Sequence, residues 1–197
     1  MSGLHADALA TLGSWSAPEP DQERLRRRYV AHLRVHPDGA SRSCRPDHLT
    51  ASTLVVDADG DRVLLTLHAK AKRWFQLGGH CESGDHRLVD AATREAREES
   101  GLAGLVLDPV PVQLSEHEVP FCRPPDGTAT DGRVVHHLDV RFLAVVAADA
   151  VPEVSEESLD VRWWPADALP DPEPELLDLV RLARARVGVS RGTPGAD

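Results

Sequence analysis

Residues 78–102 read GGHCESGDHRLVDAATREAREESGL, and the predicted fold follows from this stretch. Two glycines and a Gly-Asp turn come first, and a predicted helix that contains Glu95, Glu98 and Glu99 follows. Residues three and four positions apart share a helix face, so these carboxylates point the same way. Their repulsion costs a few tenths of a kcal/mol per pair, which a hard cation such as Mg²⁺ or Mn²⁺ would offset. The alternative interpretation is an acidic helix turn that faces solvent.

The stretch resembles the Nudix box, the motif of a large hydrolase family. Gly79 matches the opening glycine of the box, and the run REAREESGL from Arg94 to Leu102 matches its second half. The sequence departs from the family pattern at two points. Asp85 stands where the family has its first glutamate, and eight residues rather than seven separate it from Arg94.

The resemblance implies an α/β Nudix fold, in which a mixed β-sheet lies between helices in an α/β/α sandwich. It also implies a hydrolase that cleaves a diphosphate linkage in a nucleoside diphosphate derivative, with Mg²⁺ or Mn²⁺ as cofactor. The family roles carry over to matching positions only. Gly79, Glu95, Glu98 and Glu99 are expected to hold the metal, Glu98 and Glu99 are expected to be catalytic, and Arg94 is expected to orient an acid.

The group that takes the proton from the attacking water is not identified by the box alone. In Nudix enzymes it is often a carboxylate in a late loop, where this chain has Glu156 and Glu157. A carboxylate of the box and His80, which titrates in a useful range, are the alternatives. Asp85 either replaces the first glutamate of the box or caps the helix. His80 and Asp85 are also grouped with the expected substrate-binding residues.

A second candidate group lies outside the box. His117 ends one predicted strand, and His136 and His137 begin the next long strand. Adjacent strand residues point to opposite faces, so only one of this pair can face the site, and we expect His136 to bind substrate with His117. Three interpretations stay open for this group: a wall that contacts substrate, a small Zn²⁺ site that includes Cys122, or ordinary packing.

The composition is typical of a globular chain. Hydrophobic residues make up 41% of the 197 positions, and no apolar run approaches the ~20 residues that span a membrane. The N-terminus does not read as a signal peptide, and three scattered cysteines favour a reducing compartment, so a cytoplasmic location is expected. The net charge of −10 argues against binding to nucleic-acid polymers or anionic membranes. A phosphate substrate stays compatible with this charge, because a bound cation reverses the local sign.

Hydrophobic periodicity and turn residues predict the elements around the box. Helices are expected at 4–12 and 21–35, with Asp21 as N-cap of the second, inside an N-terminal helical extension of residues 1–47. The Nudix domain is expected to span 48–187, and a disordered tail to occupy 188–197. Within the domain we expect strands at 52–56, 62–67, 73–77, 106–107, 112–119, 134–147 and 160–164, loops at 120–133 and 148–159, a turn and short helix at 165–169, and a helix at 172–187.

Three functions are compatible with these patterns. The first is a pyrophosphohydrolase that acts on a small-molecule diphosphate. The second is a Nudix-fold sensor or ligand-binding module without turnover, and the third is a prenyl-diphosphate isomerase that would use Cys81 or Cys122. The complete glutamate triad favours the first. Many Nudix proteins are dimers, so a homodimer through the N-terminal extension is a candidate assembly.

Overall fold

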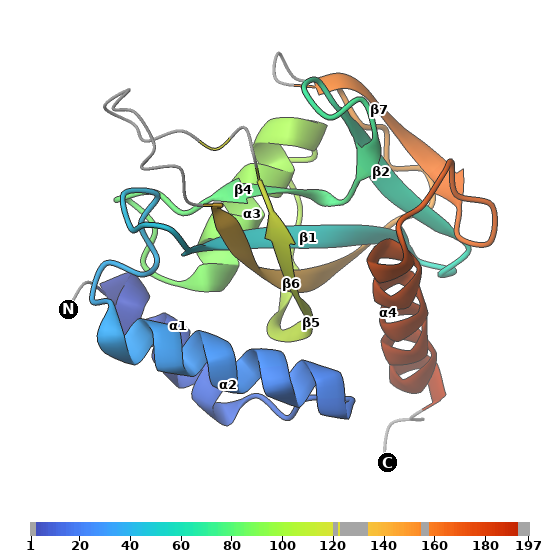
Figure 1. Cartoon of the computed structure of the whole chain (residues 1–197). Helices are drawn as coiled ribbons and strands as arrows, with labels where there is room; N and C mark the ends of the chain where they lie inside the picture. Colours follow the sequence, from blue (N-terminus) through green and yellow to red (C-terminus); the bar gives the residue numbers. More distant parts are fainter. Residues whose placement is uncertain (1–2, 120–121, 123–133, 155–157, 193–197) are drawn as a thin grey trace.

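A computed structural model describes residues 3–119, 122, 134–154 and 158–192. A seven-stranded mixed sheet lies at its centre, with helices on both sides, as Figure 1 shows. The expected α/β/α arrangement is therefore confirmed. The helices are α1 (Gly3–Ser14), α2 (Pro20–Val35), α3 (Leu88–Ser100) and α4 (Pro174–Gly192). The strands are β1 (His48–Asp57), β2 (Arg62–His68), β3 (Trp74–Phe75), β4 (Leu77–His80), β5 (Leu107–Glu118), β6 (His136–Val146) and β7 (Ser158–Pro165).

Strand β1 is the middle of the sheet. It pairs in parallel with β6 along its whole length, from His48 opposite His137 to Asp57 opposite Val146. It also pairs antiparallel with β2 and with β4, while β5 lies antiparallel to β6 and β7 to β2. All ten residues of β1 are buried, as expected for a strand that is covered on both faces.

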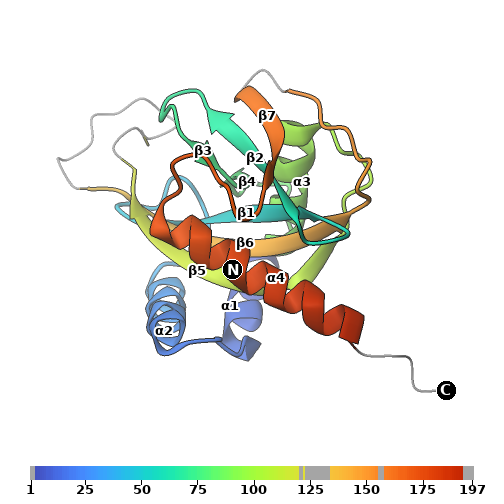
Figure 2. The same ribbon diagram turned by 90° about the vertical axis from the view of Figure 1, so that its right-hand side faces the viewer.

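The two faces of β1 belong to different cores, because successive strand residues point to opposite sides. Ala51 and Val55 lie in a core shared with α1, α2 and α3. Leu54 and Val56 lie in a second core, which α4 covers. In Figure 2, α4 passes in front of β5 and β6. Three helices therefore form one outer layer, and α4 forms the other.

The N-terminal helices pack tightly on the sheet. Their buried core residues include Leu12, Tyr29 and Leu33, all with no exposed surface. The Tyr29 hydroxyl donates a hydrogen bond of 2.7 Å to the carbonyl of Ser115 in β5. No helix in the described part of the chain has the length and apolar character needed to cross a membrane.

Most predicted elements are confirmed, but several begin or end at other residues than predicted. Helix α2 begins at Pro20 with Glu19 as its N-cap residue, so the prediction of Asp21 as N-cap is wrong. Residues 107–118 form one strand with an irregular register after Asp108, where two strands were expected. Residues 166–169 contain turns and no helix, and α4 continues past Val187 to Gly192. The expected loop at 120–133, apart from position 122, and residues 193–197 of the expected tail lie outside the described residues.

Candidate metal and active site

The glycine pair brings the acidic helix α3 close to strand β4. Gly79 pairs with Ala51 of β1, and a Cβ at Gly79 would lie 2.7 Å from the carboxylate of Glu95. Gly78 has φ +156° and pairs with Ser52, and a Cβ there would lie 2.3 Å from the Ser52 Cβ. A side chain at Gly78 would therefore overlap strand β1, and a side chain at Gly79 would displace the Glu95 carboxylate, which lies directly against the loop backbone.

The three glutamates occupy different environments on α3. Glu99 is buried, and its Oε2 accepts a hydrogen bond of 2.8 Å from the backbone N–H of Gly78. Glu95 has only 13% of its side chain exposed, whereas Glu98 has 58% exposed. Ala91 and Ala92 lie one turn before Glu95 and on the same side of the helix. They and Ala96 are small and fully buried, which allows α3 to approach the sheet closely.

Arg94 connects the acids to each other and to the loop. Its guanidinium donates to both carboxylate oxygens of Asp85 at 3.2 and 3.3 Å, to Glu95 at 3.0 Å and to Glu98 at 2.9 Å. It also donates to the carbonyl of His80 at 2.9 Å. Burial opposes the charge of Arg94, but the hydrogen bonds to Asp85 and the nearby Glu95 raise its pKa. Arg94 thus contacts three acids, where the family resemblance implied that it orients one.

Asp85 closes the turn before α3. Its Oδ2 accepts a hydrogen bond of 2.8 Å from the backbone N–H of Glu82. Arg87 occupies the N-cap position of α3, so the interpretation of Asp85 as the helix cap is wrong. The first helical N–H, of Leu88, instead donates to Oδ2 of Asp7 in α1 at 2.8 Å. Sequence spacing gave no signal for this contact, because the two residues are far apart along the chain.

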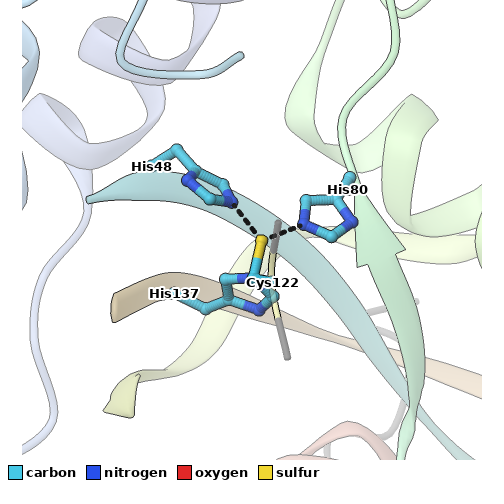
Figure 3. A group of neighbouring side chains, drawn as sticks. All are labelled: His48, His80, Cys122 and His137. Atoms are coloured by element: carbon cyan, nitrogen blue, oxygen red, sulfur yellow. Dashed lines mark hydrogen bonds between the residues drawn. The ribbon is translucent and has the colours of Figure 1, made fainter. Parts of the chain in front are cut away.

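Four side chains of types that can bind metal ions meet beside the glycine loop, as Figure 3 shows: His48, His80, Cys122 and His137. Burial lowers the pKa of His48 to about 4, of His80 to about 3 and of His137 to about 2. All three rings are therefore neutral at pH 7.

The structure brings His137, rather than His136, next to His117. The His117 and His137 ring centroids lie 5.6 Å apart. The His136 ring bonds Asp47 at 3.0 Å instead. Sequence reasoning missed His48, although His48, Thr50 and Ser52 alternate along one strand and so share a face.

A buried polar layer continues this histidine group across the sheet. Oδ1 of Asp139 accepts from the Thr50 hydroxyl at 3.0 Å, and Oδ2 accepts from the Ser52 hydroxyl at 2.7 Å. The guanidinium of Arg141, which is also buried, donates to Asp139 at 3.0 Å and to Gln113 at 2.7 Å. The layer holds β1, β6 and β5 in register behind the glycine loop.

The acidic loop begins beside the end of α3. The backbone N–H of Glu153 donates to the Ser100 carbonyl at 2.7 Å, next to Gly101, which ends the helix with φ +70°. Glu156 and Glu157, the expected proton acceptors, lie outside the described residues. Glu153 of the loop that carries them therefore lies beside the C-terminal end of α3.

A family model of the NUDIX domain matches residues 46–183. Three solved structures are similar. A C. elegans Ap4A hydrolase has 17% sequence identity and a TM-score of 0.54, and the match covers 72% of this chain and 98% of that chain. The E. coli dihydroneopterin triphosphate pyrophosphohydrolase has 20% identity and a TM-score of 0.54, with 71% of this chain and 95% of that chain covered. A NUDIX family hydrolase from Clostridium perfringens has 24% identity and a TM-score of 0.52, with 73% of this chain and 97% of that chain covered. At these identities the structures support the fold alone. None of the curated proteins compared with the sequence matches it significantly. The family match covers more than half of the chain and includes the whole box, so the chain belongs to the Nudix hydrolase superfamily.

Proposed function

We propose that this chain is a metal-dependent hydrolase that cleaves a diphosphate linkage in a nucleoside diphosphate derivative. The observation that carries this proposal is the packing of an acidic helix face on a glycine loop. Glu95 lies against Gly79, Glu99 accepts from the Gly78 amide, and Glu98 lies on the exposed side of the same helix. Membership of the Nudix hydrolase superfamily supports the reaction class.

The residues at the loop fit a hard divalent cation. Carboxylate oxygens are the ligands that Mg²⁺ and Mn²⁺ prefer, and three carboxylates of α3 lie at or near the loop. Glu95, Glu98 and Glu99, with a backbone carbonyl at Gly79, would hold the cation. When bound, such a cation neutralises diphosphate charge and lowers the pKa of a water molecule.

Residues of the chain itself fix the orientation of the three glutamate carboxylates. Arg94 holds Glu95 and Glu98 by hydrogen bonds, and the Gly78 amide holds Glu99, so each of the three carboxylates has a partner that fixes its rotamer. Such fixed charges need little reorganisation during the reaction. We assign Asp85 a positioning role, because both of its oxygens contact Arg94. The proton acceptor is then a carboxylate of the box or of the loop at 156–157.

The isomerase alternative fits less well. A cysteine that transfers protons or attacks a substrate needs access and a lowered pKa. Cys81 is 7% exposed, and burial raises its pKa to about 12. Its thiol is therefore protonated and enclosed at neutral pH.

The test is a screen of nucleoside diphosphate derivatives with Mg²⁺ or Mn²⁺, with product identification by chromatography. On any substrate found, Glu98→Gln should lower kcat by about a hundredfold or more, the scale of losing one charge-stabilising group. Glu19→Gln is the matched control, because Glu19 is also a half-exposed glutamate that pairs with an arginine, Arg181. Undiminished turnover in Glu98→Gln would refute the mechanism. Binding of these compounds without any turnover would favour the ligand-binding alternative.

A further inference from the structure

The group of His48, His80, Cys122 and His137 has the chemistry of a second metal site, separate from the glutamates. One ligand atom from each residue lies within 4.8 Å of all the others. The strand register explains why three of these side chains lie close together. His48 lies opposite His137 in the parallel β1–β6 pair, and His80 lies opposite Thr50, two residues further along β1. Figure 3 shows the Cys122 sulfur between the rings.

The distances fit a tetrahedral zinc ion. With Zn–N bonds of ~2.0–2.1 Å and Zn–S bonds of ~2.3 Å, a sulfur and a nitrogen ligand lie ~3.5–3.6 Å apart. The Cys122 Sγ lies 3.5 Å from Nε2 of His80 and 3.7 Å from Nε2 of His48. These two spacings match two edges of such a site, and the four ligand atoms all lie within 4.8 Å of one another.

The surrounding hydrogen bonds leave ligand atoms aimed at the centre. Nδ1 of His48 lies 3.2 Å from the carbonyl of Cys44, so this nitrogen carries the proton and Nε2 carries the lone pair. A carbonyl partner of this kind orients metal-bound histidines in proteins. Nε2 of His137 is buried and has no hydrogen-bond partner among the described residues. One thiol proton at Cys122 can serve only one of the two neighbouring imidazoles. A cation would satisfy these groups together.

We propose that these four residues bind one structural Zn²⁺. A thiolate with imidazoles is a typical zinc ligand set, and four protein ligands close the coordination shell, as in structural rather than catalytic zinc sites. Zinc binding releases the thiol proton of Cys122 to solvent. The ion ties position 122, beyond the end of β5, to β1, β4 and β6. His80 directly follows Gly79, and its carbonyl accepts from Arg94, so the ion also fixes the end of the glycine loop.

Zinc content tests the proposal without any substrate. The untagged protein is treated with a chelator, reconstituted with Zn²⁺ in an excess of Mg²⁺, desalted and measured by mass spectrometry of the metal. We expect one zinc per chain in the unmodified protein. Cys122→Ser and His137→Gln should weaken zinc binding by at least about tenfold, because even loss of an outer partner of a metal ligand has that effect.

Two matched controls come from the same chain. His136→Gln changes the neighbouring residue, whose ring bonds Asp47, and it should retain zinc. Cys44→Ser tests a second group, His36, Asp38 and Cys44, and it should also retain zinc, since the Cys44 carbonyl remains. Loss of zinc in Cys44→Ser together with full zinc in Cys122→Ser would overturn the assignment. So would an unmodified protein that takes up no zinc.

Cobalt substitution tests the site in the unmodified chain, so the result does not depend on whether a variant folds. Co²⁺ bound to the unmodified chain should give a thiolate-to-cobalt charge-transfer band and the intense visible bands of tetrahedral cobalt. Cobalt held only by the glutamates would give neither, and that result would overturn the proposal. None of these measurements depends on turnover, so this proposal and the proposed hydrolase function fail independently.

Discussion

Gly78 and Gly79 are neighbours, yet a side chain at each position would meet a different obstacle. At Gly78 the nearest atoms are the Cβ and Cα of Ser52 and the carbonyl oxygen of Ala51, at 2.3–2.8 Å. All three belong to the paired strand β1, and two of them are backbone atoms. At Gly79 the nearest atoms are the end of the Glu95 side chain, at 2.7 Å, which can rotate away. Gly78 is therefore needed for the packing of the strands, whereas Gly79 leaves room for the Glu95 carboxylate at the site.

This difference predicts opposite results for two alanine variants. Gly78→Ala should lower the free energy of unfolding by more than about 2 kcal/mol, because backbone must move at a left-handed φ. Gly79→Ala should lower it by less than about 1 kcal/mol and instead displace the Glu95 carboxylate, which raises the Mg²⁺ concentration needed for half-maximal activity. Urea unfolding and metal titration measure the two effects. Equal stability losses with an unchanged metal requirement would contradict this assignment.

Helix α3 depends on an element outside the box. Helix α1 places the carboxylate of Asp7 at the first N–H of α3, where it both accepts a hydrogen bond and faces the positive end of the helix. The N-cap residue itself, Arg87, makes no side-chain cap hydrogen bond. The N-terminal helices therefore stabilise the acidic helix directly.

Asp7→Ala should cost about 1 kcal/mol of stability, the usual range for losing a helix cap being roughly 0.5–2 kcal/mol. Asp7→Asn keeps an oxygen acceptor and should lose less than half as much. Chemical unfolding followed by tryptophan fluorescence compares the three proteins. If both variants are as stable as the parent, Asp7 does not act as the cap.

Local patterns in the sequence predicted the elements well, and long-range contacts explain what they missed. The Gly-Gly pair, the helical spacing of Glu95, Glu98 and Glu99, and Gly101 as the end of the helix are local signals, and the structure has this strand, loop and helix in order. The Asp7 contact and the meeting of His48 with His137 depend on tertiary packing and on the β1–β6 register. No pattern within one segment contains that information.

At the scale of the whole molecule, one buried ion pair joins the sheet to α4. Asp139 and Arg141 have only 3% and 5% of their surfaces exposed. Arg141 also lies 3.7 Å from Glu175 of α4, and Gln113 donates to the Glu175 carbonyl at 3.2 Å. The pair therefore links β1, β6 and β5 with the helix on the second face.

Asp139→Ala should destabilise the protein by about 3–5 kcal/mol, because it leaves the charge of Arg141 buried without its main partner. Replacing both residues, as in Asp139→Leu with Arg141→Met, should cost less than the sum of the two single changes, since no unpaired charge remains. Urea unfolding of Asp139→Leu, of Arg141→Met and of the double variant measures the coupling between the two side chains. Additive losses would show that the two charges do not interact energetically.

The parallel pairing of β1 with β6 also has a consequence during synthesis. The roughly ninety residues between the ends of these strands take about 5 to 18 s to translate at ~5–20 residues per second. During that interval β1, which is buried along its whole length in the finished protein, has no β6 to pair with. A nascent chain on the ribosome thus presents β1 for seconds without the strand that covers its β6 edge. Chaperones that bind extended apolar segments would find their target at residues 49–56.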